Sequence, residues 1–361
     1  MKVLYVGTLG PECSTCFSRF SALQKLELDV HGFDTDPYFK WEQSLIGRLH
    51  QMVETHLLFG MHHEKANFDL ILKCRELRPN IVWIDTGVWI KSSTLRLLKQ
   101  MGCFLVMHIT DALKALNWRV RYKRRQLNST LPLYNVLLTT NINDYKTLAG
   151  SLAPTCFLTD LGYDNDLFTS APMPTELAKK WDNDIVFIGH YEKSTEAGIL
   201  ALIDAGLSVT VFGHNTWFSS PNRARLGERL KPFLSNQDYV SAIKGASIGL
   251  CFVSALNYNQ TAGRSFEIPG SGTFLLAPRT KQHLNYYLEG VEAEFFSDLV
   301  ELVGKAKYYL KHPTEREDIA MQGYKRCLKS GYSWYSIMAR DWPKVLQVYA
   351  NYKLVDVDNY D

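Results

Sequence analysis

The chain contains 361 residues, 46% of them hydrophobic and 21% charged, which is the composition of a soluble globular protein and excludes extensive disorder. Its 40 basic and 37 acidic residues give a formal net charge of +3, which is too balanced for a dedicated nucleic-acid-binding protein. The length predicts about two domains, and the apolar runs fall short of the ~18 residues that a membrane-spanning helix needs.

Short apolar segments alternate with segments of helical periodicity in the first half of the chain. Residues 2–7 (KVLYVG) predict a buried strand, which a small-residue turn connects to a helix over residues 17–28. A long helical stretch is predicted over residues 41–77. Further strands are predicted at residues 29–36, 80–87, 103–110, 136–141 and 155–162. This alternation predicts a mainly parallel, doubly wound α/β sheet with helices on both faces.

The pattern changes at residues 169–184 (TSAPMPTELAKKWDND), where two prolines and several charges predict a linker between domains. After this segment the strand–turn–helix order begins again, with strands predicted at residues 184–190, 209–214, 246–253 and 273–278. We therefore predict Rossmann-like domains over residues 1–170 and 171–332, followed by helices over residues 333–361. Two such domains would face a cleft at the carboxyl ends of their strands, where open α/β folds bind ligands.

Residues 263–278 (GRSFEIPGSGTFLLAP) carry the most informative chemistry of the chain. Ser265 is expected to cap a short helix with Glu267 in its first turn, and Arg264 adds positive charge to that helix end. Such an end binds an anion, and a neighbouring carboxylate suits the two vicinal hydroxyls of a sugar. From the residues alone, the alternative is a capped helix with a solvated Arg–Glu pair.

The same region resembles the C-terminal signature of GT-B glycosyltransferases, and most closely the spore maturation protein CgeB-like family. The resemblance is carried by RSFEIPGSGTFLLAPRT, YYLEGVEAEFF and YYLKHPTEREDIAMQGYKR, and it extends to DIVFIGHYE and LGYDNDLF. In the first domain it includes KVLYVG, PNIVWIDTGVW and TTNINDYKTL. It implies a GT-B fold, in which two Rossmann-like domains face a cleft and the C-terminal helices over residues 333–361 pack back toward the first domain. It also implies transfer of a sugar from a nucleotide-diphospho-sugar, held mainly by the second domain, to an acceptor on the first.

The resemblance also implies roles for individual residues of the second domain. Glu267 falls where such enzymes bind the hydroxyls of the donor ribose. The residues that fall where they hold the diphosphate are Arg264, Ser265, Gly189, His190 and, as a helper, Lys193. Positive charge at this place would stabilise the departing nucleoside diphosphate, so we expect no metal and no cofactor besides the nucleotide-sugar co-substrate.

In the first domain, the resemblance aligns His108 with a histidine that faces the donor sugar in related retaining enzymes. It also implies that the loop containing Gly7, Gly10 and Thr15 reaches the diphosphate or the acceptor. From the residues alone, His108 can equally be a buried histidine at a strand end. Asp111 is a candidate base for the acceptor hydroxyl or the N-cap of the helix that follows it.

One position departs from the pattern of many retaining enzymes of this superfamily. They carry a second glutamate eight residues before the ribose-binding one, where this chain has Asn259. An amide can hydrogen-bond a sugar hydroxyl but cannot act as a base. The resemblance favours retention of the anomeric configuration, and Asn259 leaves inversion open. Asn259 also keeps a catalytically silent nucleotide- or partner-binding protein as an alternative. A nucleotide-sugar epimerase on the same fold is another.

Three further patterns have competing explanations. The basic residues of the segment Arg119–Arg125 predict a solvated helix face, a contact with a phosphate-rich acceptor or anionic membrane surface, or nucleic-acid binding. The side chains of His62 and His63 would diverge by ~100° on a helix, and Cys13 and Cys16 lack a second cysteine pair, so neither pair predicts a metal site.

We expect a cytoplasmic protein with reduced thiols, with attachment to the inner membrane face as an alternative. Its acceptor is a glycan, a protein, a lipid-linked molecule or a nucleic acid.

Overall fold

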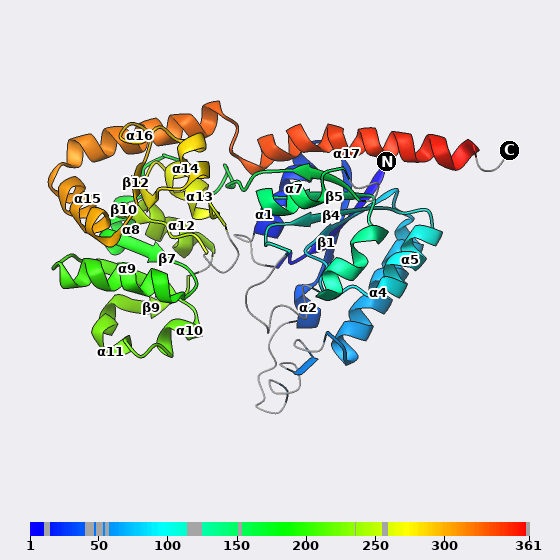
Figure 1. Ribbon diagram of the computed structural model, residues 1–361, viewed down its shortest axis with the longest axis horizontal. Coiled ribbons are helices and arrows are strands. Elements are labelled where there is room, and N and C mark those ends of the chain that lie inside the picture. The colour runs from blue at the N-terminus through cyan, green and yellow to red at the C-terminus, as the bar shows by residue number, and fades with distance from the viewer. Residues whose placement is uncertain are drawn as a thin grey trace. The chain divides into compact units, whose positions relative to one another are not determined.

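The computed structural model describes residues 1–10, 15–39, 47, 53–54, 58–113, 125–150, 154–234, 236–254 and 259–358. The chain divides into two compact units (Figure 1). Unit 1 contains the described residues up to Asp160 together with those from Tyr335 onward, and unit 2 contains the described residues between them. The domain ends expected from the sequence lie at residues 170 and 332.

Unit 1 is built on a six-stranded parallel sheet with the strand order β2-β1-β3-β4-β5-β6. Its strands are β1 (Lys2–Gly7), β2 (Asp29–Asp34), β3 (Ile81–Asp85), β4 (Phe104–Ile109), β5 (Val136–Thr139) and β6 (Thr155–Leu158). The central strand β3, with the sequence IVWID, is buried along its whole length because helices cover both faces of the sheet. This arrangement confirms the doubly wound α/β sheet predicted from the alternation of strands and helices.

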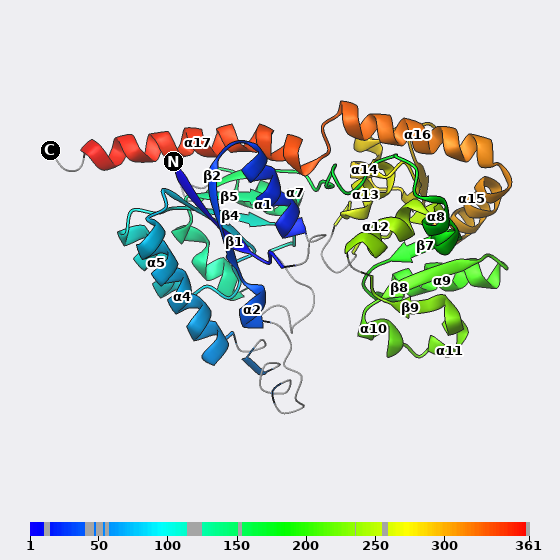
Figure 2. The ribbon, with the colours of Figure 1, turned by 180° about the vertical axis from the view of Figure 1, so that it is seen from behind.

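The helices of unit 1 pack on the two sheet faces according to the alternation of side chains along each strand. They are α1 (Thr15–Lys25), α2 (Asp36–Phe39), α4 (Met61–Leu77), α5 (Ser92–Gln100), α7 (Ile142–Leu148) and, after its first residue, α17 (Trp334–Asp358), with a 3-10 turn at Leu131–Leu133. Leu4 and Val82 share a core with α4 and α5. Trp83 and Phe104 point to the other face and contact aromatic rings of α17, which runs beside the sheet (Figures 1 and 2).

Unit 2 repeats this design with a second six-stranded parallel sheet, ordered β12-β11-β10-β7-β8-β9. Its strands are β7 (Asn183–Ile188), β8 (Val209–Gly213), β9 (Leu230–Pro232), β10 (Ala246–Leu250), β11 (Phe274–Pro278) and β12 (Glu294–Phe296). The helices are α8 (Thr175–Trp181), α9 (Lys193–Asp204), α10 (Asn215–Phe218), α11 (Arg223–Leu226), α12 (Asn236–Lys244), α13 (Arg264–Gly270), α14 (Lys281–Tyr286), α15 (Leu299–Lys311) and α16 (Pro313–Lys329), with a 3-10 turn at Gly227–Arg229. Helices α9 and α15 share one core with alternate residues of β7, β8, β10 and β11.

The predicted linker over residues 169–184 differs from the structure. It contains helix α8 and the beginning of strand β7, and both belong to unit 2. Trp181, the last residue of α8, is buried and packs its ring against Phe212, with 5.9 Å between ring centroids. The two prolines and the charges of this segment obscured a short amphipathic helix, because only Leu177 and Trp181 mark its apolar side.

Candidate nucleotide-sugar site

The predicted donor residues of unit 2 follow two neighbouring strands at one edge of the sheet. All strands are parallel, so their carboxyl ends share this edge. The strand order reverses between β7 and β10, because the chain continues from β7 to β8 on one side and later returns to β10 on the other. Gly189 directly follows β7, and α13 follows β10. This reversal is the position at which open α/β sheets bind ligands.

Arg264, the first residue of α13, reaches from the β10 side of this reversal to the β7 side. Its guanidinium group lies over the ring of Phe187 in β7, 5.7 Å from the ring centroid. A Cβ atom on Gly189 would lie 3.0 Å from Nη2 of Arg264 and 2.8 Å from the Phe187 ring, so the close approach needs a glycine. The Nε atom of Arg264 is buried and has no hydrogen-bond partner in the described structure. A buried cationic N–H group without a partner is costly, and a bound anion would remove that cost.

Glu267 lies one helical turn after Arg264 and is 8% exposed. Its Oε2 accepts a hydrogen bond of 2.5 Å from the hydroxyl of Tyr239, which comes from α12. Burial raises the pKa of Glu267, while the Tyr239 hydrogen bond and the Arg264 charge act in the opposite direction. Oε1 lies beside Gly263, 3.2 Å from where a Cβ atom of that residue would be. The sequence placed Glu267 and Arg264 together, but it gave no signal that Tyr239 joins them.

Ser265 lies in the interior, with its side chain committed to hydrogen bonds within unit 2. Its Oγ accepts from the backbone N–H of Ala262 (3.0 Å) and lies 2.8 Å from Nε2 of His283. Because Nδ1 of His283 lies 2.7 Å from the carbonyl of Pro278, Nδ1 is the donor and the Ser265 hydroxyl donates to Nε2. Burial lowers the pKa of His283 to about 4, so this ring is neutral. Its backbone N–H donates to the Ala262 carbonyl (2.9 Å), so the polar groups of Ser265 are already engaged, and its role in diphosphate binding stays a prediction. Helix α13 has Gly263 as its N-cap, so the expectation that Ser265 caps this helix is wrong.

The remaining predicted donor residues are more exposed. His190 is exposed and stacks on the ring of His214, with 4.9 Å between ring centroids. Lys193 is exposed at the first position of α9. Asn259 is half-buried, and its backbone N–H donates to the Ser254 carbonyl (3.1 Å). The structure therefore brings Glu267, Arg264 and Gly189 into direct proximity, and it records no contact of Lys193 or Asn259 with them.

The predicted loop of unit 1 begins at the end of β1. Gly7 is buried, and a Cβ atom on it would lie 3.3 Å from both Asp85 and Tyr5. Gly10 is exposed near Asp36, and Thr15 begins α1. The residues between Gly10 and Thr15, among them Cys13, lie outside the described part of the chain.

Beneath Gly7, four side chains of unit 1 form a buried cluster. Asp85, at the end of β3, accepts hydrogen bonds at Oδ2 from the Tyr5 hydroxyl (2.5 Å) and from Nε of Arg19 (2.7 Å). Burial would raise the pKa of Asp85, but the charge of Arg19 and further contacts hold it below its usual range. His108 lies opposite Asp85 in the sheet register. The sequence indicated His108 as a strand-end residue but gave no signal for Arg19, which lies in a helical segment and has the pattern of an exposed position.

His108, the predicted contact to the transferred sugar, has no exposed surface. Its ring stacks on Trp83, with 6.3 Å between ring centroids. Burial lowers its pKa to about 3, and the Arg19 charge acts in the same direction. Asp111 is half-buried near the end of β4, and the helix that it was expected to cap lies mostly outside the described residues. Catalytic roles for His108 and Asp111 stay predictions.

Other predicted features have clear structural positions. Nδ1 of His62 forms a hydrogen bond with Glu54 (2.8 Å), and Glu54 also accepts one from the backbone N–H of Met61. Met61 and His62 begin α4, so Glu54 stabilises the first turn of that helix. No group of three or more His, Cys, Asp or Glu residues in the described part of the chain is arranged to hold a metal ion. The cysteines for which a state is described are free thiols. The basic segment 119–125 lies outside the described residues except for Arg125.

None of the helices among the described residues is both long and apolar enough to cross a lipid bilayer.

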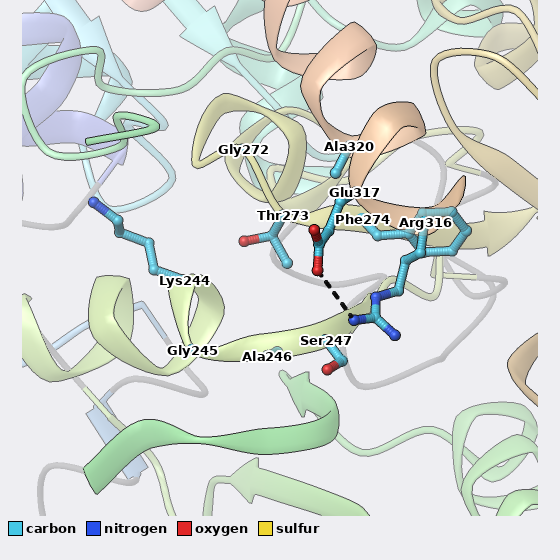
Figure 3. Close-up of a pocket in the computed structure, with 10 residues that line it drawn as sticks. All are labelled: Lys244, Gly245, Ala246, Ser247, Gly272, Thr273, Phe274, Arg316, Glu317 and Ala320. Atoms are coloured by element: carbon cyan, nitrogen blue, oxygen red, sulfur yellow. Dashed lines mark ion pairs between the residues drawn. The ribbon is translucent and has the colours of Figure 1, made fainter. Parts of the chain in front are cut away.

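A separate hollow of about 210 Å³ lies at the opposite, amino-terminal edge of the unit 2 sheet (Figure 3). It is lined by the first residues of β10 and β11 and by the start of α16. Its Arg316 donates to the Tyr309 carbonyl (2.9 Å) and forms an ion pair of 3.8 Å with Glu317. None of the predicted donor residues is among the described residues that line this hollow, so it is distinct from the candidate nucleotide-sugar site.

Solved structures of known proteins share this fold. The sucrose-phosphate synthase of Thermosynechococcus elongatus is 12% identical, with a TM-score of 0.67 over 97% of this chain and 100% of that one. HepE of Anabaena, in complex with UDP-glucose, is 12% identical, with a TM-score of 0.63 over 96% and 100%. The protein known as the putative UDP-N-acetylglucosamine 2-epimerase of Listeria monocytogenes is 12% identical, with a TM-score of 0.54 over 92% of this chain and 96% of that one. These likenesses show that the chain has the GT-B fold predicted from its sequence.

The sequence comparison adds a family match to this fold. Residues 197–340 match a family model described as glycosyl transferase-like, which covers most of unit 2. The chain therefore carries a glycosyltransferase domain on a GT-B fold. No curated protein matches it by sequence. The finer resemblance to the CgeB-like family stays a prediction.

Proposed function

We propose that the chain transfers a sugar from a nucleotide-diphospho-sugar donor, bound by unit 2, to an acceptor hydroxyl. The single observation that carries this proposal is the pair Arg264 and Glu267 at the strand-order reversal of unit 2, where a buried guanidinium N–H has no partner in the described structure. The family match of residues 197–340 supports the same reaction class. A cation and a carboxylate one helical turn apart suit the diphosphate and the ribose hydroxyls of one nucleotide.

Arg264 would supply the chemistry of the departing group in this proposal. Bond cleavage between the sugar and the diphosphate leaves negative charge on the nucleoside diphosphate, and a guanidinium group already held in position stabilises this charge. The pKa of Arg264 is raised, against the effect of burial, by Tyr239, Cys251 and Glu267, so the group stays cationic. We therefore propose a reaction that needs no metal ion.

We propose a UDP-sugar as the first donor to test, because solved structures of the same fold include complexes with UDP and with UDP-glucose. For the stereochemical outcome we propose retention, with Asn259 binding a sugar hydroxyl through its amide. The anomeric configuration of the product, read by NMR coupling constants, tests retention directly. The acceptor class is open among glycans, proteins, lipid-linked molecules and nucleic acids.

The test of the proposed function is donor binding by wild-type protein and by Glu267→Gln. Thermal shifts with UDP, GDP, ADP, CDP and TDP, with and without a divalent metal ion, identify the nucleotide. A ligand present at ~100 times its dissociation constant stabilises the folded state by about 2.7 kcal/mol. The variant should bind the same nucleotide more weakly by about 1–3 kcal/mol, because it loses a charged hydrogen bond to the ribose.

Glu294→Gln is the matched control, since Glu294 is another buried carboxylate of unit 2 and bonds Tyr309 and Lys305 rather than α13. It should leave nucleotide affinity unchanged in folded protein. If no nucleoside diphosphate binds the wild-type chain, the proposal is wrong, and a catalytically silent protein becomes the better explanation. Consumption of a nucleotide-sugar without any acceptor would instead indicate the epimerase or a hydrolase.

A further inference from the structure

We propose that Tyr239 is a positioning residue of the donor site, which holds one oxygen of Glu267 so that the other faces the donor ribose. This inference rests on the proposed function, because it assigns the task of orienting the carboxylate that would bind the nucleotide. Tyr239 is 28 residues away from Glu267 in the chain and lies on a different helix.

The ring of Tyr239 is fixed by its surroundings. It is 8% exposed and packs edge-on against Phe168, with 6.1 Å between ring centroids, while Phe233 lies at 6.4 Å. Its hydroxyl donates to Oε2 of Glu267 at 2.5 Å, a short distance that is typical of a charge-assisted hydrogen bond. Because a tyrosine ring has few rotatable bonds, this packing defines the place of the hydroxyl and hence of Oε2.

The bond leaves the two carboxylate oxygens in different situations. Oε2 is used by Tyr239, while Oε1 lies beside the backbone of Gly263 and receives no hydrogen bond from a described residue. Without the tyrosine hydroxyl, the strongest attraction on this carboxylate would be the Arg264 guanidinium, one helical turn away. A direct Arg264–Glu267 pair would occupy the cation and the carboxylate together, and both would be lost to the nucleotide. The Tyr239 hydroxyl also interacts with Arg264, so it stands between the two opposite charges and keeps them from pairing directly.

The same hydrogen bond affects the proton of Glu267. Burial raises the pKa of this carboxyl group, and the Tyr239 hydrogen bond is the first of the contacts that oppose the rise. Burial and the neighbouring Glu267 raise the pKa of Tyr239 itself, so its hydroxyl stays a donor. Two ribose hydroxyls bind best to an ionised carboxylate, so affinity falls as the pH falls through the Glu267 pKa. Removal of the tyrosine hydroxyl shifts this loss of affinity to higher pH.

Tyr239→Phe tests the inference, with Tyr287→Phe as the matched control. Tyr287 is also buried, and its hydroxyl donates to the Ser265 carbonyl of the same helix (2.9 Å), so its loss also removes one buried hydrogen bond to α13. Glu267 is titrated by NMR of protein with labelled glutamate carboxyl carbons, and Glu267→Gln assigns the signal. Calorimetry measures the affinity for the tightest-binding of the five nucleoside diphosphates between pH 5 and 8.

In Tyr239→Phe, the Glu267 pKa should rise and the dissociation constant at pH 7.5 should increase about tenfold. The loss of nucleotide affinity at low pH should begin at higher pH. Tyr287→Phe should change neither the Glu267 pKa nor the affinity nor its pH dependence. With a donor sugar, KM should rise and kcat should stay nearly constant, because ribose contacts are equal in the ground and transition states. Unchanged Glu267 titration and affinity in Tyr239→Phe would overturn the inference, and so would equal effects of both variants.

Failure of the proposed function gives a different result. In that case the wild-type chain binds none of the five nucleoside diphosphates, and both the function and the positioning role are wrong. If the wild-type chain binds one of them and Tyr239→Phe binds it equally well with the same pH profile, only the role of Tyr239 is wrong.

Discussion

Arg19 and Asp85 form an ion pair of 2.6 Å in which each side chain is 1% exposed. A buried pair of this kind gives little net stability against two apolar residues, but the loss of one partner leaves an uncompensated charge. We expect Arg19→Met to lower the free energy of unfolding by about 3–5 kcal/mol, because Asp85 would keep only the Tyr5 hydroxyl as a strong donor. Urea denaturation followed by tryptophan fluorescence measures this loss.

The double variant Arg19→Met with Asp85→Leu separates charge from packing, and it should recover part of the lost stability. Lys73→Met is the exposed control, since Lys73 pairs with Glu76 on the surface of α4 and should change stability by less than about 1 kcal/mol. An Arg19→Met protein as stable as the wild type would show that water or neighbouring groups solvate Asp85.

At the scale of single residues, the sequence predicted which side chains lie together on one helix, but it did not predict contacts between side chains of different elements. Arg264 and Glu267 are three residues apart, so any helix places them on one side. Tyr239 contacts Glu267 across 28 residues, and Arg19 contacts Asp85 across 66. Both partners lie in helical segments where a polar residue normally indicates an exposed position. Their burial follows from how α12 and α1 pack, which no local pattern encodes.

The C-terminal helix α17 is held to unit 1 by aromatic contacts and by one buried carboxylate. Trp342 packs on Trp83, and Tyr349 packs edge-on against Phe104. Asp341 has no exposed surface and accepts hydrogen bonds from the Thr159 hydroxyl (2.5 Å), which follows β6, and from Lys344 (2.7 Å). At the start of the helix Trp334 is buried, whereas its neighbour Tyr335 is 42% exposed.

We expect Asp341→Ala to destabilise unit 1 by about 1–3 kcal/mol, because the Thr159 hydroxyl loses its acceptor in the interior. Hydrogen exchange should show faster opening of α17 and of the end of β6, while the strands of unit 2 keep their protection. Asp318→Ala, at an exposed position of α16, is the control and should leave both units unchanged. Uniformly faster exchange in both units would argue against a local role of Asp341.

At the scale of the whole molecule, the alternation of apolar strands and helical segments was enough to predict two parallel sheets. Strand β3 shows why, since a strand buried on both faces needs an unbroken apolar run. Strand order and the return of the chain to unit 1 depend instead on distant contacts, such as that between Thr159 and Asp341, 182 residues apart. These contacts gave no local signal, and for them only the family resemblance offered an expectation.

Each unit also contains a buried histidine with a lowered pKa, and this predicts how the protein responds to acid. Burial lowers the pKa of His108 in unit 1 to about 3 and that of His283 in unit 2 to about 4. An unfolded histidine has a pKa near ~6.5, so the unfolded chain binds more protons than the folded one below that pH. This stabilisation is complete above about pH 6.5 and is lost as the pH falls toward the folded values.

Each histidine should therefore cost its unit about 1.4 kcal/mol per pH unit once the pH is well below ~6.5. The lowered pKa of Asp85 adds nothing in this range, because an unfolded aspartate titrates near ~3.9. In unit 2 the raised pKa of Glu267 acts in the opposite direction, because the folded carboxyl group binds its proton at higher pH than the unfolded one, so the slope of unit 2 should be shallower than that of unit 1. Calorimetric scans between pH 5 and 7 measure the effect. His108→Gln should be less stable at pH 7 but flatten the pH dependence of unit 1 alone, and His283→Gln should do the same for unit 2. If both variants keep the wild-type slope, other groups bind the protons, and the two histidines are not the acid-sensitive groups of the fold.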